Sequence, residues 1–375
     1  MLLPKDNSLK VAIIHDWINN LGGAERVLFE LHAIFPKAPI YTLFYNPDLT
    51  IKYLHDAEIR TSALQKIPFI NKIYKYLVFL MPLAVEAFDF SEFDLVISSS
   101  FGFSKGLILK PSTKHLCYCY SPTRFLWDQS HEYTKSSKSD FKKWISRIFQ
   151  HFLRIWDRQS ALRVDEFVAI SEYVKTRIKK YYQREAKVIY PPAPISGQDI
   201  ETREGDYYLI VSRLFKHKNI HVAVDAFNKL GLPLVIIGQG PEEKKLKKIA
   251  GPNIQILGYL SDKKIIKYYA NSKAFIMPQD EDFGLTPVEA MSFGKPVLAL
   301  RKGGALETII EGQTGEFFDD PIPEALADGV RRLNKNYHLY NISFIKSQAQ
   351  KFSKENFKKN ILQAIAQLIS NDNMI

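Results

Sequence analysis

Short apolar runs alternate with helix-forming stretches along this chain, and the whole alternation occurs twice. In the first half the apolar runs lie at Val11–Ile14, Leu95–Ser98, His115–Cys119, Phe167–Ile170 and Val188–Tyr190. In the second half they lie at Tyr208–Ser212, Leu234–Ile237, Ile254–Leu257, Ala274–Met277 and Val297–Leu300. Continuous apolar strands separated by helices are typical of parallel sheets that helices cover on both faces. The pattern therefore predicts an α/β chain with two doubly wound, Rossmann-like units.

A proline-rich stretch separates the two halves. Pro191-Pro-Ala-Pro194 is followed by the polar residues 196–206, which is a composition typical of an interdomain linker. A chain of 375 residues is also long for one hydrophobic core. We therefore expect a domain boundary between residues 195 and 196, and ligands at the carboxyl ends of the strands.

The stretch Glu281-Asp-Phe-Gly-Leu-Thr-Pro-Val-Glu289 follows one of the apolar runs. A strand, a glycine-containing turn and a helix start form an anion site, because the first N–H groups of a helix lack partners and its dipole is positive there. We expect Glu281 at the mouth of this site and Glu289 in the first helical turn, where both carboxylates suit sugar hydroxyls. By itself the acidic run 280–282 also fits a solvated loop or a divalent-metal site.

Two cations, Arg213 and Lys218, follow the apolar run Tyr208–Ser212. A forked guanidinium and an ammonium in one strand-to-helix loop suit a diphosphate, although alone they would be ordinary loop charges. Gly238-Gln-Gly240 ends the next apolar run, but it lacks the third glycine of the dinucleotide fingerprint and is weak evidence for NAD or FAD.

The formal net charge of +11 and the pI near 9.3 indicate an anionic partner, which nucleic acid, a membrane surface or a phosphorylated substrate would each satisfy. No nucleic-acid-binding motif is recognisable, so nucleic acid is not the expected partner. Cys117 and Cys119 lack the spacing of a zinc or redox site and fit a reducing compartment. Neither a signal peptide nor an apolar stretch of membrane-spanning length is expected, so the expected location is cytoplasmic.

Two segments mix aromatic, aliphatic and basic residues: residues 67–80 and Phe141–Trp156. The second predicts a helix with its large apolar side chains near one face. Such a helix can lie in a lipid headgroup layer, giving peripheral contact with the inner face of the cell membrane. It can equally pack its apolar face on a core and leave a solvated basic rim. The sequence leaves both readings open.

Taken in order, these motifs resemble glycosyltransferase family 4. The resemblance rests on Arg213 and Lys218, Gly238-Gln-Gly-Pro241, the stretch from Glu281 to Met291, and Gly303-Gly-Ala-Leu-Glu307. In the first half, His15-Asp-Trp17, Gly22-Gly-Ala-Glu-Arg26 and the stretch from Cys117 to Asp128 are similar to the subgroup that contains bacterial O-antigen mannosyltransferases.

The resemblance implies a GT-B fold of two Rossmann-like domains facing a cleft. The implied divisions are an acceptor-side domain at 1–195, a sugar-nucleotide domain at 196–350, and a C-terminal helix at 351–375 that crosses back to the first domain. It also implies a retaining hexosyl transfer without a required metal or other cofactor. The donor is a nucleotide sugar, with GDP-mannose preferred and a UDP-hexose as the alternative. The acceptor is a glycan or a lipid-linked glycan in surface polysaccharide synthesis.

Residue roles follow from the same resemblance. Arg213 and Lys218 hold the diphosphate and stabilise the leaving group, while Glu281 holds hydroxyls of the transferred sugar and Glu289 those of the ribose. The remaining donor-binding positions are Gly22, Gly23, Gly258, Tyr259, Leu260, Phe283, Gly284, Leu285 and Thr286. The acceptor positions are His15, Asp16, Trp17, Tyr120, Arg124 and Trp127, with packing an equal alternative for the two tryptophans.

Tyr120 departs from the family pattern, since related sequences commonly carry histidine there. A phenol has a reference pKa of about 10 and is a poor proton acceptor near neutrality, although it still donates a hydrogen bond. An epimerase of the same architecture needs acid–base groups on the sugar, and the missing histidine weighs against it. A non-catalytic sugar-nucleotide or glycan-binding subunit is the other alternative, and retention of Arg213, Lys218, Glu281 and Glu289 weighs against that.

Overall fold

The computed structural model describes residues 9–130, 140–197 and 200–370, which form two compact units. The first unit comprises the chain up to Tyr190 together with the C-terminal residues from Phe357 onward. The second comprises Pro191–Asn356. The sequence placed the divisions at 195 and 351, a few residues from where the compact units divide.

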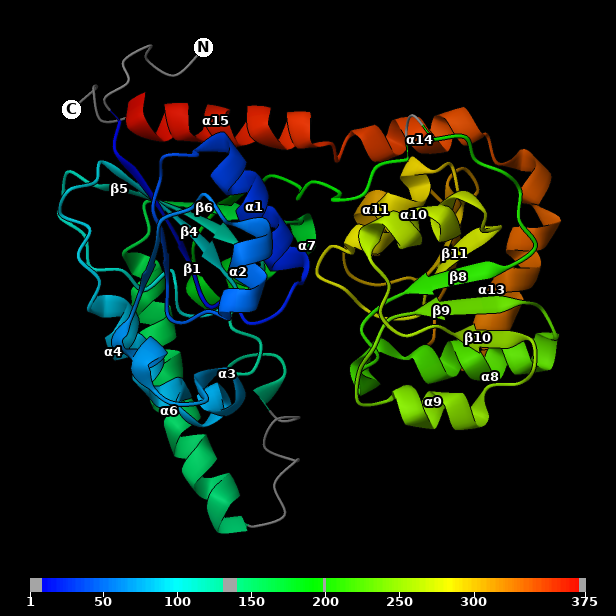
Figure 1. The fold of residues 1–375 in the computed structure, drawn as a ribbon, viewed down its shortest axis with the longest axis horizontal. Helices are drawn as coiled ribbons and strands as arrows, with labels where there is room; N and C mark the ends of the chain where they lie inside the picture. The colour runs from blue at the N-terminus through cyan, green and yellow to red at the C-terminus, as the bar shows by residue number, and fades with distance from the viewer. Residues whose placement is uncertain (1–8, 131–139, 198–199, 371–375) are drawn as a thin grey trace. The chain divides into compact units, whose positions relative to one another are not determined.

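The first unit contains a seven-stranded parallel sheet in the order β3-β2-β1-β4-β5-β6-β7 (Figure 1). Its strands are β1 (Val11–His15), β2 (Ile40–Thr42), β3 (Ile59–Thr61), β4 (Leu95–Ser100), β5 (Lys114–Cys119), β6 (Glu166–Ala169) and β7 (Ala186–Val188). Three-residue β2 and β3 were not expected, because neither forms a long apolar run. The strand order changes direction between β1 and β4, where a parallel sheet leaves a crevice at its carboxyl edge.

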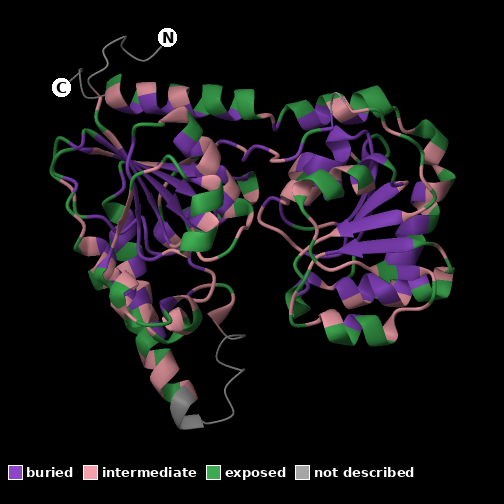
Figure 2. Cartoon of the chain, viewed as in Figure 1, coloured by how far each residue is buried: buried purple, intermediate pink, exposed green. Residues whose placement is uncertain are grey.

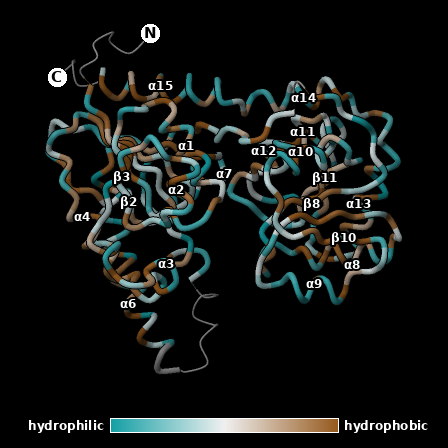
Figure 3. Tube along the Cα trace, viewed as in Figure 1, coloured by the Kyte–Doolittle hydropathy of each residue, from teal (hydrophilic) through white to brown (hydrophobic). Residues whose placement is uncertain are grey.

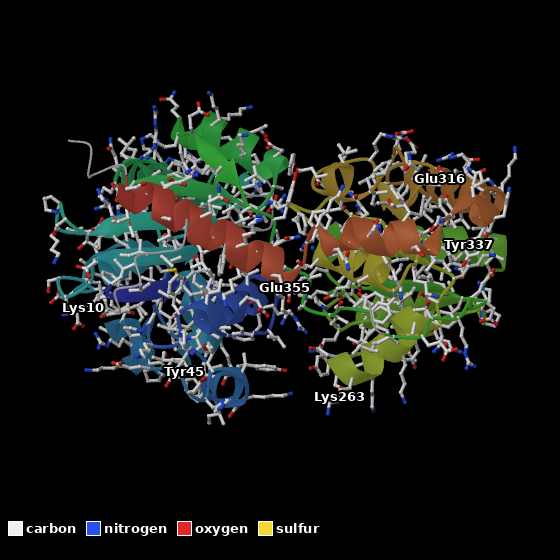
Figure 4. The ribbon with its side chains drawn as sticks, turned by 90° about the horizontal axis from the view of Figure 1, so that it is seen from above. Lys10, Tyr45, Lys263, Glu316, Tyr337 and Glu355 are labelled. Carbon is white, nitrogen blue, oxygen red and sulfur yellow. The ribbon has the colours of Figure 1, made fainter. Side chains whose placement is uncertain are left out.

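Helices cover both faces of this first sheet, as the buried strands require. One face is packed against residues 63–86, which include α3 (Ile70–Ile73) and α4 (Met81–Glu86), and against part of α6 (Asp140–Leu162). The other face meets α1 (Gly23–Ile34) and the C-terminal helix α15 (Lys354–Ser370), whose Phe357 ring lies 5.6 Å from that of Tyr118. Figure 4 shows Glu355 at the start of α15. The remaining helices are α2 (Pro47–Tyr53) and α7 (Glu172–Tyr182).

The second unit contains a six-stranded parallel sheet in the order β10-β9-β8-β11-β12-β13. Its strands are β8 (Tyr208–Val211), β9 (Leu234–Ile237), β10 (Ile254–Ile256), β11 (Ala274–Met277), β12 (Val297–Leu300) and β13 (Gly315–Phe318). All five apolar runs predicted as strands in the second half are strands in the structure, whereas β13 was not predicted from the sequence. Figure 2 shows both sheets buried beneath partly exposed helices.

Helices enclose the second sheet in the same way. On one face α8 (Ile220–Leu230), α9 (Glu243–Ile249) and α13 (Pro323–Lys335) share one apolar core with the strands. On the other lie α10 (Asp262–Ala270), α11 (Leu285–Ser292) and α14 (Ile342–Gln350), with short α12 (Ala305–Thr308) after β12. The strand order changes direction between β8 and β11, so the loops after these two strands meet at the carboxyl edge.

A buried ion pair holds α6 against the loops at one edge of the first sheet. Lys105 Nζ lies 2.5 Å from Asp157 Oδ1, and both side chains are 1% exposed. Asp157 also accepts from Thr123 Oγ1 and from the indole of Trp127, each at 2.7 Å. Lys105 donates a second bond to the Gly102 carbonyl at 2.7 Å. The carboxylate thus joins the helix to two loops at the carboxyl edge of the sheet.

Replacing Asp157 by alanine should destabilise the first unit by about 3–5 kcal/mol, because the Lys105 charge would be left buried without its partner. The matched control is Glu185→Ala, since Glu185 forms an exposed pair with Lys179 and exposed pairs contribute about 0–1 kcal/mol. Thermal and urea unfolding of the three proteins measure the effect. Equal stability of the two variants would show that the buried pair is not needed.

Candidate active site

The loops at the carboxyl edge of the second sheet are bonded to one another. The backbone N–H of Leu214 donates to Gln239, and that of Gly238 donates to Gly258, at 3.0 and 2.8 Å. The Gly304 N–H donates to the Glu281 carbonyl at 2.9 Å. The Asn219 side-chain amide, after β8, donates to the Pro278 carbonyl, after β11, at 3.4 Å. The loops that follow β8, β9, β10, β11 and β12 are therefore held in one arrangement, and they carry the motifs predicted to bind the donor.

Lys218 and Glu281 form an ion pair at this edge. Lys218 is 7% exposed, and its Nζ donates to Glu281 Oε1, which also accepts from Gln279 Nε2 at 3.1 Å. Burial by itself would raise the pKa of Glu281, but the charge and hydrogen bond of Lys218, with smaller contributions from Gln279 and Arg213, hold that pKa below its usual value. Within the described residues, Glu281 Oε2 has no protein hydrogen bond, so a charged oxygen is available to a hydroxyl donor.

The helix start near this pair is open to an anion. α11 begins at Leu285, two residues earlier than expected, because Gly284 adopts a left-handed φ of 88° that turns the chain directly into the helix. No side chain caps this described helix, so its first N–H groups point out at the end of the turn. Gly303 packs against the same turn: a Cβ there would lie 2.2 Å from the Glu281 carbonyl oxygen.

Glu289 lies in the second turn of α11, not the first, because the helix starts earlier than expected. It is 4% exposed, and its Oε2 accepts a hydrogen bond from the Tyr269 hydroxyl at 2.7 Å. The Tyr269 ring stacks on Phe293 with centroids 5.4 Å apart. Tyr269 and Gln279 are thus two residues that sequence reasoning missed, each orienting a predicted carboxylate through a hydroxyl or amide group.

The other donor-side candidates divide by exposure. Arg213 is exposed beside Phe215, with its guanidinium 5.6 Å from the ring centroid. Tyr259 is 60% exposed, whereas Phe283 is 3% exposed and supports the turn from within. Gly258, Leu260, Leu285 and Thr286 lie on the loops and helix start described above.

In the first unit, a chain of hydrogen bonds runs from His15 to the first turn of α1. His15 Nδ1 lies 2.9 Å from Ser99 Oγ, Ser99 Oγ lies 2.8 Å from the Tyr120 hydroxyl, and that hydroxyl donates to the Ala24 carbonyl at 3.0 Å. Burial lowers the pKa of His15 to about 3, although its bond to Ser99 opposes the shift, so the imidazole is neutral near pH 7. Burial also raises the pKa of Tyr120 well above its usual range.

Asp16 is fully buried and shapes the neighbouring loop. Its carboxylate accepts backbone N–H bonds from Phe101, Phe103 and Ser104 at 2.8, 2.5 and 2.7 Å. Burial raises the pKa of Asp16, while these three bonds and the charge of Lys105 oppose the rise. With both oxygens bonded to backbone N–H groups and no exposed surface, Asp16 orders the loop at residues 101–104.

Both candidate tryptophans are packed. Trp17 stacks on Phe44 and meets Phe101 edge-on, with centroids 5.8 and 4.9 Å apart. Trp127 stacks on Tyr181 at 4.9 Å and donates to Asp157. Packing, the alternative weighed from the sequence, therefore accounts for both rings.

Two further candidates on the first unit are polar. Arg124 lies 3.9 Å from Asp128 and keeps about a third of its side chain exposed. The Gly22 amide, just before α1 begins at Gly23, already donates to Glu25 Oε2 at 2.8 Å. A carboxylate at this helix start makes the Gly22 amide a poor phosphate ligand.

The described residues contain no cluster of His, Cys, Asp or Glu side chains arranged to hold a metal ion. Among the described helices, none has the length and apolar character needed to cross a bilayer.

Replacing Glu281 by glutamine should remove a pH-dependent contribution to the stability of the second unit. Because the folded-state pKa of Glu281 is depressed, its stabilising effect is present above the unfolded value and is lost as the pH falls through the folded value. The difference in melting temperature between wild type and Glu281→Gln should therefore be largest near neutrality and shrink below about pH 4. Glu243→Gln, on an exposed pair with Lys247, is the control. A difference independent of pH would contradict the ion pair.

Models of known families match almost the whole chain. The model described as "Glycosyltransferase Family 4" matches residues 21–196, and "Glycosyl transferases group 1" matches residues 197–369. The two matches meet at the proline-rich linker and together span both units.

Individual proteins are similar at lower identity. The alpha-1,3/1,6-mannosyltransferase ALG2 of Dictyostelium discoideum is 23% identical over 84% of this chain and 87% of its own length. An uncharacterized glycosyltransferase of Methanocaldococcus jannaschii, MJ1178, is 27% identical over 50% of this chain, a match that spans about half of that relative's length (54%).

The fold is shared with solved structures. Anabaena Alr3699/HepE, crystallised with UDP-glucose, superposes with a TM-score of 0.69 over 95% of this chain and 99% of its own, at 17% identity. The two parallel-sheet units, the paired family matches and this similarity in fold agree with one another. The chain is therefore a glycosyltransferase of family 4 with the GT-B fold.

Proposed function

We propose that this glycosyltransferase transfers mannose from GDP-mannose, with retention of configuration, to a glycan or lipid-linked glycan acceptor of a surface polysaccharide, on the cytoplasmic side of the membrane. The observation that carries the proposal is the Lys218–Glu281 pair, which lies beside the uncapped start of α11 and in the same loop set as exposed Arg213. The mannosyl donor is supported by the similarity to proteins named as mannosyltransferases.

The donor site combines a place for negative charge with places for hydroxyl groups. The N–H groups at the start of α11 and the Arg213 guanidinium would hold the diphosphate, and Lys218 adds a fixed positive charge that needs no reorientation. Glu281 Oε2 would accept from hydroxyls of the transferred sugar, and Glu289 from the ribose. The base would lie along Gly258, Tyr259 and Leu260, and Gly23 would approach the phosphates without a side chain.

The proton transfer is assigned to the donor itself. As the acceptor oxygen bonds to the anomeric carbon, the bond to the diphosphate breaks on the same face, and a leaving phosphate oxygen takes the hydroxyl proton. Tyr120 does not serve as the base, because burial raises the pKa of its phenol and its hydroxyl already donates to Ala24. Neutral His15 holds the Ser99–Tyr120 chain in place, and Arg124 would meet a phosphate of a lipid-linked acceptor.

A UDP-hexose is the second candidate donor. It is supported by a neighbour in fold, Alr3699/HepE, whose crystal structure contains UDP-glucose. The polar groups described at this edge bind diphosphate and hydroxyls, and both candidates share these groups.

Melting temperature in the presence of GDP, UDP, ADP and their sugar forms separates the donors, because a ligand that binds only the folded state raises the melting temperature. We expect the largest rise with GDP or GDP-mannose. The rise should disappear in Arg213→Ala and persist in Arg331→Ala, which removes an exposed arginine of α13. Transfer to a lipid-linked glycan, with NMR of the new anomeric centre, then tests the reaction. Selective UDP binding would move the donor to a UDP-hexose, and absence of any nucleotide effect would refute the site.

Removing the Tyr269 hydroxyl should weaken donor binding without disturbing the helix. Tyr269→Phe keeps the ring stacked on Phe293 but deletes the bond to Glu289. A hydrogen bond to a charged group contributes about 1.5–3 kcal/mol, so the donor Kd should rise about tenfold or more. Tyr268→Phe, one residue earlier on α10, is the control. Isothermal titration of both variants gives the comparison, and equal Kd values would exclude an orienting role for Tyr269.

A further inference from the structure

The first unit exposes large apolar side chains on two adjoining elements. On α6, Trp144, Phe149, Phe152 and Ile155 are 59, 48, 64 and 50% exposed. In the segment before and including α4, Phe69, Tyr76 and Phe79 are 76, 81 and 49% exposed. The two elements meet where the rings of Phe79 and Phe149 lie 5.8 Å apart. Figure 3 shows apolar residues on α6 and on the nearby segment around α3. We call these seven side chains the aromatic surface.

α6 presents large apolar side chains to solvent, although its inner side is partly polar. Its buried positions include Gln150, Asp157 and Ser160, and Asp157 is held by Lys105, Thr123 and Trp127. Leu153 and Trp156 pack on the core beside these polar groups, while the four large apolar side chains of α6 named above face solvent. The helix is also anchored to the end of α4, since Trp156 Nε1 donates to Glu86 Oε1 at 2.8 Å. The exposure is therefore built into the packing of the helix.

Basic residues are interspersed with the aromatic surface. Residues 66–85 contain Lys66, Lys72 and Lys75 but no acidic residue, and residues 141–156 contain no acidic residue either. Lys66, Lys72, Lys75 and Arg147 are exposed, and Lys72 Nζ lies 6.0 Å from the Phe69 ring centroid. Aromatic groups interleaved with cations suit the headgroup layer of an anionic bilayer, where rings enter the interface and cations meet phosphates.

We propose that the aromatic surface docks this protein on a membrane containing anionic lipids. A second copy of the chain fits the surface poorly, because a two-fold contact would bring like charges together. The surface lies entirely within the first unit, and its contact with lipid is independent of which donor or acceptor the enzyme uses.

Flotation of the full chain with lipid vesicles tests the proposal, with no nucleotide sugar and no acceptor lipid present. We expect flotation with vesicles of phosphatidylcholine and phosphatidylglycerol, weakening as salt is added, and little with phosphatidylcholine alone. Trp144→Ala/Phe152→Ala should abolish most binding. Lys72→Gln/Lys75→Gln should reduce it about 25-fold, since each cation near an anionic surface contributes about fivefold. The controls are Leu339→Ala/Phe344→Ala and Lys263→Gln/Lys264→Gln, which change exposed residues of the second unit and should float like wild type.

Three outcomes would overturn the proposal. The first is no flotation with either vesicle type, and the second is undiminished flotation of Trp144→Ala/Phe152→Ala. The third is a lipid-free dimer, seen by sedimentation velocity, that this double variant converts to monomer, because the surface would then be a contact between copies. Unchanged melting temperatures of the variants, expected for exposed side chains, show that they fold. No substrate is present in the flotation test. A negative flotation result therefore does not argue against the proposed transfer reaction, and a failure of transfer does not argue against membrane docking.

Discussion

Parallel strand pairing is the constraint on which the rest of this structure depends. Every strand in the described chain pairs in parallel with its neighbours, so each connection must cross back over a face of the sheet, and all carboxyl ends of one sheet fall on the same edge. Arg213, Lys218, Glu281 and Glu289 are spread over more than seventy positions of sequence, yet the loops that carry them are bonded to each other at that edge. The chemistry of the site follows from this convergence more than from any single motif.

Charge neutralisation differs between the two units. In the second unit a buried lysine is matched by one carboxylate, whose other oxygen remains available, so the pair is stable without a ligand and still able to bind one. In the first unit the carboxylates of Asp16 and Asp157 have each accepted several donors, and they order loops instead of presenting oxygens. Acidic residues near the carboxyl edges of the two sheets thus differ: within the described chain Glu281 keeps an oxygen without a protein hydrogen bond, whereas Asp16 and Asp157 order the chain around them.

The sequence predicted the elements that have strong local signals. Apolar runs identified β1, β4 to β6 and β8 to β12. The missed strands β2, β3 and β13 read Ile-Tyr-Thr, Ile-Arg-Thr and Gly-Glu-Phe-Phe; each mixes polar with apolar residues, and only pairing with a neighbouring strand makes them recognisable. The order of site motifs was readable through the resemblance to family 4. The roles of Tyr269 and Gln279 could not be predicted from the sequence, because they depend on distances to carboxylates on other turns or elements. Periodicity likewise found the apolar stripe of α6 but could not tell which way the stripe faces.

The hydrogen bonds of Asp157 give α6 a property that neither its length nor its aromatic residues would suggest. The helix is fixed at Asp157 to the loop that holds Thr123 and Trp127, next to Tyr120 and Arg124, while Trp144 lies thirteen residues earlier on the same helix. At about 1.5 Å per residue, the two points are about 20 Å apart along the axis. If Trp144 lies at a bilayer surface, as proposed, the length of α6 limits the height of that loop above the lipid to about 20 Å. The proposed lipid-linked acceptor would then have to reach no further than this from the membrane.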